Sequence, residues 1–109
     1  MDITYTAGQE KFNYRVCAVM ISGNKILAMH DERSPYFYLP GGRVKMGETA
    51  ECAVIREVEE ELGVTPKIVR PLWLNQGFFT SLAGLLLVLF WIIPYVYELF
   101  VTMEKLFTL

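Results

Sequence analysis

The hydrophobic and polar positions along the chain predict four short strands and one helix. Residues 15–21 and 25–29 are rich in strand formers and flank a Ser-Gly-Asn turn, which predicts a β-hairpin. Residues 36–39 predict a third strand, which a Pro-Gly-Gly sequence ends, and residues 67–74 predict a fourth. We therefore expect a fold of the α/β class.

The helix has the clearest local signals in the sequence. Thr49 is a favourable N-cap and Gly63 occupies the C′ position, so the helix is expected between them. Its apolar residues form one stripe that would face the core: Ala50, Val54, Ile55, Val58 and Leu62. Glu57, Glu60 and Glu61 share one side of the same helix, at the edge of that stripe.

Composition narrows the class of protein. A chain of 109 residues suits a single domain over residues 1–109, and 53% hydrophobic residues exclude intrinsic disorder. A net charge of −2 argues against a nucleic-acid polymer as the partner. Cys17 and Cys52 have neither a disulfide-scaffold pattern nor zinc-ligand spacing. The first residues show no signal-peptide core, so a cytoplasmic location is expected.

The three glutamates on one helix side allow two interpretations. Acidic runs are usually solvated helix faces, and taken alone that reading is the more common one. The other interpretation is a site for a hard divalent cation, because Mg²⁺ takes oxygen ligands and is often shared between carboxylates and substrate phosphates. The residues around the helix decide between them.

Residues 42–64 read GRVKMGETAECAVIREVEEELGV and fit the pattern G-x5-E-x7-R-E-U-x-E-E-x-G-U, where U is a bulky aliphatic residue. The fixed positions are Gly42, Glu48, Arg56, Glu57, Glu60, Glu61 and Gly63. This is a complete match to the signature of the Nudix hydrolases, and the chain resembles that family over roughly residues 12–75. The resemblance implies an α/β/α sandwich with a mixed sheet. It also implies hydrolysis of a nucleoside diphosphate linked to another moiety, with Mg²⁺ or Mn²⁺.

Each residue of the motif has an expected role beside this resemblance. Glu60 and Glu61 would be direct metal ligands. Glu57, one turn earlier, would be a further ligand or would accept a proton from the attacking water. The Gly42 carbonyl is expected as an additional ligand, since glycine lets the backbone approach closely.

Other residues would support this site. Glu48 and Arg56 would form a bidentate pair that joins the loop to the helix. Arg15 could project toward a substrate phosphate, although an exposed strand arginine is the more common interpretation of such a residue. Tyr36 and Tyr38 share a strand face and would either stack on a base or pack at the rim of the core.

The last third of the chain is unusual. From Pro71 to Tyr97 there are 27 residues without a charge. For residues 82–109, three interpretations stay open: a closing strand and a helix over 95–107, a membrane span over 78–97 with the domain in the cytosol, or a truncated, non-native ending. If exposed, this apolar segment would also favour a homodimer.

The leading functional expectation is a Mg²⁺-dependent hydrolase of the diphosphate linkage in a nucleotide, nucleotide-sugar or dinucleotide. The alternative is a non-catalytic nucleotide-binding or sensing module of the same fold, or an inactive truncated fragment. Family members often supply another acidic residue from a later loop, and here none lies between Glu61 and Glu98. This departure favours the alternative, whereas the complete carboxylate set favours the hydrolase.

Overall fold

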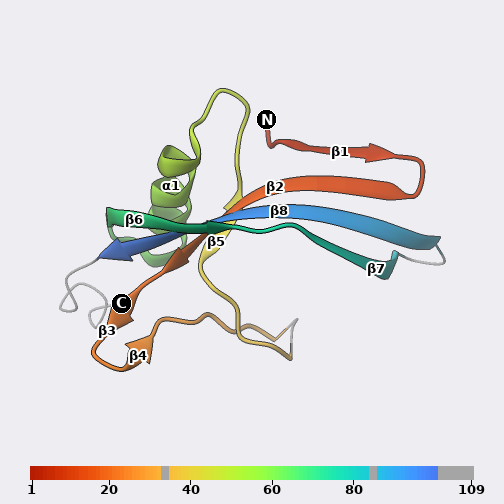
Figure 1. The fold of residues 1–109 in the computed structure, drawn as a ribbon. Coiled ribbons are helices and arrows are strands. Elements are labelled where there is room, and N and C mark those ends of the chain that lie inside the picture. Colours follow the sequence, from red (N-terminus) through yellow and green to blue (C-terminus); the bar gives the residue numbers. More distant parts are fainter. Residues whose placement is uncertain (33–34, 84–85, 101–109) are drawn as a thin grey trace.

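The fold is known from a computed structural model that describes residues 1–32, 35–83 and 86–100, with only the backbone described for residues 79–95 and 100. In these residues it consists of a six-stranded main sheet, a separate two-stranded hairpin and one helix (Figure 1). The elements are β1 (Thr4–Ala7), β2 (Glu10–Val19), β3 (Ile21–Ser22), β4 (Lys25–Ile26), β5 (Gly41–Arg43), α1 (Ala50–Leu62), β6 (Lys67–Leu74), β7 (Gly77–Ala83) and β8 (Leu86–Phe100).

The main sheet is mixed and has β2 and β8 at its centre. These two strands run parallel over their whole shared length, from Glu10 beside Leu89 to Val19 beside Glu98. On the side of β2 away from β8, β1 and β5 pair with successive parts of β2, both antiparallel. On the side of β8 away from β2, β7 and β6 pair with successive parts of β8, also antiparallel. β3 and β4 form a separate two-stranded hairpin.

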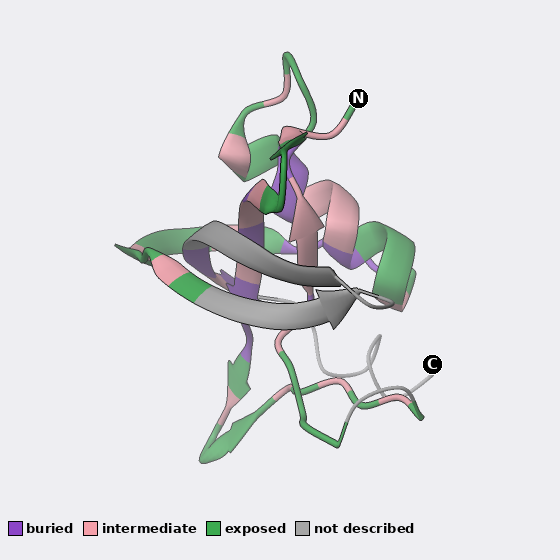
Figure 2. Ribbon diagram, turned by 90° about the vertical axis from the view of Figure 1, so that its right-hand side faces the viewer, coloured by how far each residue is buried: buried purple, intermediate pink, exposed green. Residues whose placement is uncertain are grey.

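Helix α1 covers one face of this sheet. Its first turn is capped by the Thr49 hydroxyl, which accepts a hydrogen bond from the Cys52 amide at 3.1 Å. It ends at Gly63, whose φ of 70° is the left-handed conformation that glycine adopts without strain. Figure 2 shows buried residues gathered where the helix meets the sheet. The core there is Val16, Ala18, Met20, Val44, Ala53, Val54, Val58, Val64, Tyr97 and Leu99.

Several predicted elements are confirmed, and one is wrong. α1 has the predicted bounds, residues 67–74 form β6, and a hairpin follows β2 with its turn at the predicted position. Residues 36–39 do not form a strand; Tyr38 makes only a single bridge to Met29. The next strand is β5, which begins at Gly41 and Gly42, the two glycines that were expected to end a strand over residues 36–39.

The described residues of the apolar last third form strands. The closing helix predicted over 95–107 is wrong for residues 95–100, which belong to β8, and residues 101–109 lie outside the described residues. A helical span over 78–97 is also not what the structure has, because 78–83 and 86–97 lie in β7 and β8. In the described part of the chain, no helix is long and apolar enough to cross a membrane. In the same residues α1 is the single helix, and its packing against a mixed sheet agrees with the α/β sandwich class that was expected.

Candidate active site

Strand β5 presents its outer edge to helix α1. The amide of Ala18 bonds to the Pro40 carbonyl at 2.8 Å, and the amide of Val44 bonds to the Tyr14 carbonyl at 3.0 Å. Hydrogen-bonded pairs alternate along an antiparallel ladder, so Gly42 is the β5 residue whose amide and carbonyl face β2. The backbone groups of Gly41 and Arg43 therefore point outward, toward the side chains of the helix.

Each residue of β5 meets one side chain of α1. The Gly41 amide bonds to the Glu61 carboxylate, and the Arg43 carbonyl accepts a hydrogen bond from Arg56 Nη2 at 3.0 Å. A Cβ atom on Gly42 would fall onto the Glu57 carboxylate, within 2.5 Å of both oxygens. Gly42 thus contributes space rather than a free carbonyl, and the outward carbonyl beside the glutamates belongs to Gly41.

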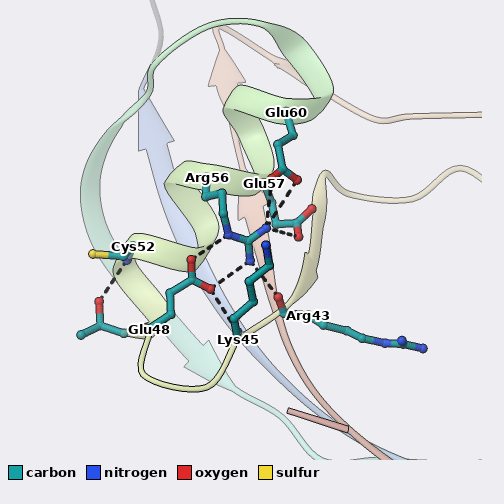
Figure 3. Close-up of polar contacts among 8 residues, drawn as sticks. Arg43, Lys45, Glu48, Cys52, Arg56, Glu57 and Glu60 are labelled. Atoms are coloured by element: carbon teal, nitrogen blue, oxygen red, sulfur yellow. Dashed lines mark hydrogen bonds and ion pairs between the residues drawn. The ribbon is translucent and has the colours of Figure 1, made fainter. Parts of the chain in front are cut away.

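Arg56 is the centre of the polar network (Figure 3). Its Nε and Nη2 atoms bind the two oxygens of Glu48 at 2.7 and 2.9 Å, which is the bidentate geometry expected from the sequence. The Lys45 amide also donates to Glu48, at 3.1 Å. The hydrogen bonds from Arg56 are the main cause that lowers the pKa of Glu48 to about 2, with a smaller effect of the Lys45 amide. The bonds to Glu48 and Glu57 raise the pKa of Arg56. The pair joins the loop before the helix to the helix itself.

The structure brings the three glutamates of the motif to one region. Arg56 Nη1 lies 2.8 Å from a Glu57 oxygen and 3.4 Å from both oxygens of Glu60. Partial shielding of the Glu61 carboxyl group from water raises its pKa, and the charges of Glu57 and Glu60 raise it further. The Gly41 amide and the charge of Arg15 act in the opposite direction. One guanidinium therefore does not neutralise this group of carboxylates.

The donor set has the chemistry that a hard divalent cation needs, since carboxylate oxygens and an outward glycine carbonyl are suitable ligands. The charges of Glu57 and Glu60 lie close enough to Glu61 to raise its pKa, in addition to the larger effect of burial, and a cation would offset this repulsion. Across residues 1–32, 35–83 and 86–100, no three acidic, histidine or cysteine side chains converge closely enough to hold an ion as placed. The glutamates are of the right chemical type for such an ion and lie in one region of the structure. Two of them, Glu57 and Glu60, are hydrogen-bonded to Arg56.

The other predicted site residues are placed differently. Arg15 lies in β2, close enough to Glu61 to lower the pKa of that carboxyl group. The Tyr38 hydroxyl donates to Asp31 at 2.9 Å, and Tyr36 is 75% exposed on the same loop. A role of Tyr36 or Tyr38 in substrate binding stays a prediction.

Two residues in the network are missing from the sequence-based site. The Gly41 amide and the Arg43 carbonyl both bind helix side chains. Their involvement depends on β5 being a strand, because only the pairing with β2 turns these groups outward. Gly41 and Arg43 flank Gly42 in the motif, and this adjacency was the one available signal.

The fold and this arrangement agree with the comparison with known families. A family model for the NUDIX domain matches residues 11–96. The chain belongs to the NUDIX domain family. The match runs from the start of β2 into β8, so it includes the sheet centre, β5 and the helix that carries the glutamates.

Known relatives match parts of the chain. The ADP-ribose pyrophosphatase of Methanocaldococcus jannaschii is 45% identical over 56 residues, which are 49% of this chain and 33% of that protein. The 8-oxo-dGTP diphosphatase of Escherichia coli K12 is 61% identical over 28 residues, 26% of this chain and 22% of that protein. The chain thus spans a third or less of the length of these two relatives.

Solved structures share the fold. The MutT protein of Methanosarcina mazei Go1 superposes with a TM-score of 0.60 and 26% identity, covering 89% of this chain and 69% of that one. A MutT protein of the Nudix hydrolase family from methicillin-resistant Staphylococcus aureus 252 gives a TM-score of 0.59 at 24% identity, covering 85% and 68%. The second likeness shows the α/β sandwich fold alone.

Proposed function

We propose that this chain is a Mg²⁺- or Mn²⁺-dependent hydrolase that cleaves the diphosphate linkage of a nucleoside diphosphate derivative. The observation that carries the proposal is the juxtaposition of Glu57, Glu60 and Glu61 with the glycine strand β5. A diphosphate is repelled by such a cluster unless cations lie between them. The relatives named as a pyrophosphatase and a diphosphatase act on this class of linkage, which supports the proposal.

In this proposal each residue of the site has a separate role. Glu60 and Glu61 hold the cation, with the Gly41 carbonyl facing the same place. Glu57 is fixed by Arg56 on one side and bounded by Gly42 on the other, so its carboxylate either joins the ligands or accepts a proton from the attacking water. When bound, the divalent cation neutralises phosphate charge and makes water more acidic.

Glu48 and Arg56 hold these residues in place. Their bidentate pair fixes the loop against the helix, and the bond from Arg56 to the Arg43 carbonyl fixes β5. Arg56 also reaches Glu60, but at 3.4 Å that contact is long for a charged hydrogen bond. Glu60 is therefore the carboxylate that moves most readily from Arg56 to a cation.

A second candidate function is a binding or sensing module that holds a nucleotide without cleaving it. Arg56 Nη1 already occupies the space between Glu57 and Glu60, which favours this candidate. It predicts that nucleotides bind while no hydrolysis is measured with Mg²⁺ or Mn²⁺.

The location and assembly of the chain are part of the proposal. We place it in the cytoplasm, with a small-molecule diphosphate as partner. The net charge of −2 argues against a nucleic-acid polymer as a partner. A homodimer is favoured by the apolar residues that remain exposed on β6 and at the start of β7: Val69, Trp73, Leu74 and Phe78.

The test is phosphate release from a panel of nucleotide sugars, dinucleotides and nucleoside triphosphates, with Mg²⁺, with Mn²⁺ and with EDTA. Glu60→Gln and Glu61→Gln should each lower turnover at least about 100-fold. Glu59→Gln is the matched control, because Glu59 is an exposed residue of the same helix and loses the same charge. Near-wild-type turnover in both site variants would contradict the ligand assignment, and nucleotide binding without hydrolysis on the whole panel would favour the second candidate.

A further inference from the structure

The main sheet has four outer strands, β1, β5, β6 and β7, each paired on one side only within the described residues. The outer side of such a strand carries backbone N–H and C=O groups that can pair with a strand of another chain. Natural sheets protect these edges with short strands, charged residues, proline or bulges. An edge without any such protection therefore indicates where a partner strand can be added.

Three of the four edges are protected. β1 has four residues, and β5 has three residues whose outward groups bond to side chains of α1. β6 contains Lys67, Arg70 and Pro71, and its register with β8 shifts at two places. Each of these features opposes the pairing of a further strand.

β7 is the edge that lacks this protection. Its seven residues, GFFTSLA, include no charge and no proline, and its register with β8 is continuous from Gly77 to Ala83. It lies within the stretch of 27 uncharged residues from Pro71 to Tyr97. Figure 1 shows β7 along the end of the sheet that extends away from α1, and the helix packs against β2, β5 and β6 instead. A long and regular edge is thus accessible.

The properties of β7 favour a second copy of this chain as the partner. An uncharged strand offers no charge complementarity to an acidic or basic segment of another protein. A lipid surface is disfavoured as well, because hydrocarbon cannot hydrogen-bond the backbone groups of an open edge. Two β7 strands that pair antiparallel about a twofold axis satisfy each other's edges, so the assembly closes at two copies.

The arrangement of β6 and β7 is compatible with this pairing. Both strands follow the same side of β8, with Leu74 beside Tyr95 and Gly77 beside Ile92. Antiparallel pairing centred on β7 places the end of the partner's β7 next to the start of β7, so β6 of each copy continues past the other strand. Leu74 and Phe78, which are 58% and 59% exposed, lie at this place and would be covered.

We propose that this chain forms a twofold dimer in which the β7 strands of two copies pair edge to edge and join the two main sheets into one. The proposal rests on the homodimer that is part of the proposed function, and it adds the strand that makes the contact. Main-chain hydrogen bonds along β7 would supply the register, and the apolar residues beside them would supply buried area.

The first experiment measures the dimer dissociation constant by analytical ultracentrifugation, without nucleotide or metal. Thr80→Lys and Ser81→Lys each place a charge on β7, and successive residues of a strand point to opposite faces, so the two variants test both faces. Each should weaken the dimer at least about tenfold, because the twofold axis brings the added charges of the two copies together. Thr6→Lys is the matched control, an exposed threonine on the edge strand β1, and it should leave the constant unchanged.

The second experiment needs no variant. Every second amide of β7 points away from β8, and dimer formation should slow its hydrogen exchange at least about tenfold between a dilute and a concentrated wild-type sample. The Thr6 amide on β1 also points away from its neighbouring strand and is the internal control, because its exchange should be the same in both samples.

The pairing is wrong if the protein stays monomeric, if both lysine variants of β7 keep the wild-type constant, if Thr6→Lys weakens the dimer equally, or if the β7 amides exchange alike in both samples. A monomer that sediments with phosphatidylcholine vesicles would identify a lipid surface as the partner instead. A dimer that both β7 variants retain would support the homodimer through another surface. None of these measurements involves turnover, so failure here and failure of the proposed hydrolase are distinguishable.

Discussion

Gly42 has its effect through the absence of a side chain. The Glu57 carboxylate fills the position that a Cβ atom would occupy, so any larger residue must displace it. Gly42 is also paired with Val16, which leaves the backbone little freedom to move away. The glycine of the motif is therefore required for the placement of Glu57, not for an unusual backbone conformation.

We expect Gly42→Ala to lower stability by about 1–3 kcal/mol and to lower hydrolysis about 100-fold, because the carboxylate is pushed out of position. Thermal unfolding and turnover measure the two effects. Gly77→Ala is the control, because a Cβ on Gly77 would meet nothing within 4 Å. Wild-type turnover in Gly42→Ala would show that Glu57 does not need this position.

The Glu48 carboxylate makes stability depend on acid. Its pKa is lowered from 4.5 to about 2, mainly by the hydrogen bonds from Arg56, so the folded protein keeps it ionised where the unfolded chain does not. The resulting stabilisation is complete above pH 4.5 and is lost as the pH falls from there toward 2. Glu61 acts in the opposite direction, because partial burial, together with the charges of Glu57 and Glu60, raises the pKa of its carboxyl group.

Glu48→Gln should therefore be less stable than the wild type at pH 7, by about 2–3 kcal/mol, since it leaves Arg56 without its main partner. The difference should shrink between pH 4.5 and 2. Urea unfolding at pH 7, 5, 4 and 3 measures it, with Glu59→Gln as a charge-matched control on the helix surface. A constant difference at every pH would contradict the lowered pKa.

At the scale of elements, three segments meet at one junction beside the site. The Ile3 amide donates to the Val44 carbonyl at 2.7 Å, the Val44 amide to Tyr14 at 3.0 Å, and the Tyr14 amide to Ile3 at 3.1 Å. The residues that precede β1 therefore leave β2 at this point and run along the loop that carries Glu48. The Met46 amide extends the contact by donating to Met1 at 2.7 Å.

Ile3→Pro removes the amide that bonds to Val44, and it should lower both stability, by about 1–2 kcal/mol, and the affinity for Mg²⁺. Thr6→Pro is the control, because the register turns the Thr6 amide away from β2, where proline is tolerated on an edge strand. Calorimetry with Mg²⁺ and thermal unfolding measure the effects. Equal affinities in the two variants would show that the junction does not position the loop.

How far the elements could be predicted depends on how local their signals are. The helix follows from Thr49, Gly63 and an apolar stripe that are all within one segment, and its bounds are confirmed. The Glu48–Arg56 pair spans only eight residues, so spacing and charge suffice to anticipate it. The motif likewise anticipates the family, whose match extends over residues 11–96.

The remaining elements depend on distant partners. Two glycines have low strand propensity, and β5 exists because β2 supplies a ladder for it. Residues 86–100 are apolar without alternation, and periodicity cannot separate a central strand from a helix in such a run. Arg15 and Arg43 are 28 positions apart in the chain, and only the register makes them opposite partners.

At the scale of the whole molecule, the helix and the sheet cover unequal areas. α1 packs against β2, β5 and β6, while β1 and β7 lie at the end of the sheet that extends away from it (Figure 1). The buried core follows the helix: Val16 and Ala18 are fully buried, whereas Tyr5 on β1 is 57% exposed. Strands β2 and β8 both run from the covered region into the other.

This asymmetry predicts two levels of protection in hydrogen exchange. The amides of Tyr5 and Ala18 are both in hydrogen-bonded ladder positions, yet Ala18 lies in the core and should exchange at least about 100-fold more slowly. Val54→Ala, which shortens a fully buried side chain of α1, should accelerate exchange at Ala18 and leave Tyr5 unchanged, because Tyr5 opens locally. Hydrogen exchange measured by NMR in the wild type and in Val54→Ala tests this difference between the two amides. If the sheet opened as one unit, the two amides would exchange at similar rates and Val54→Ala would accelerate both.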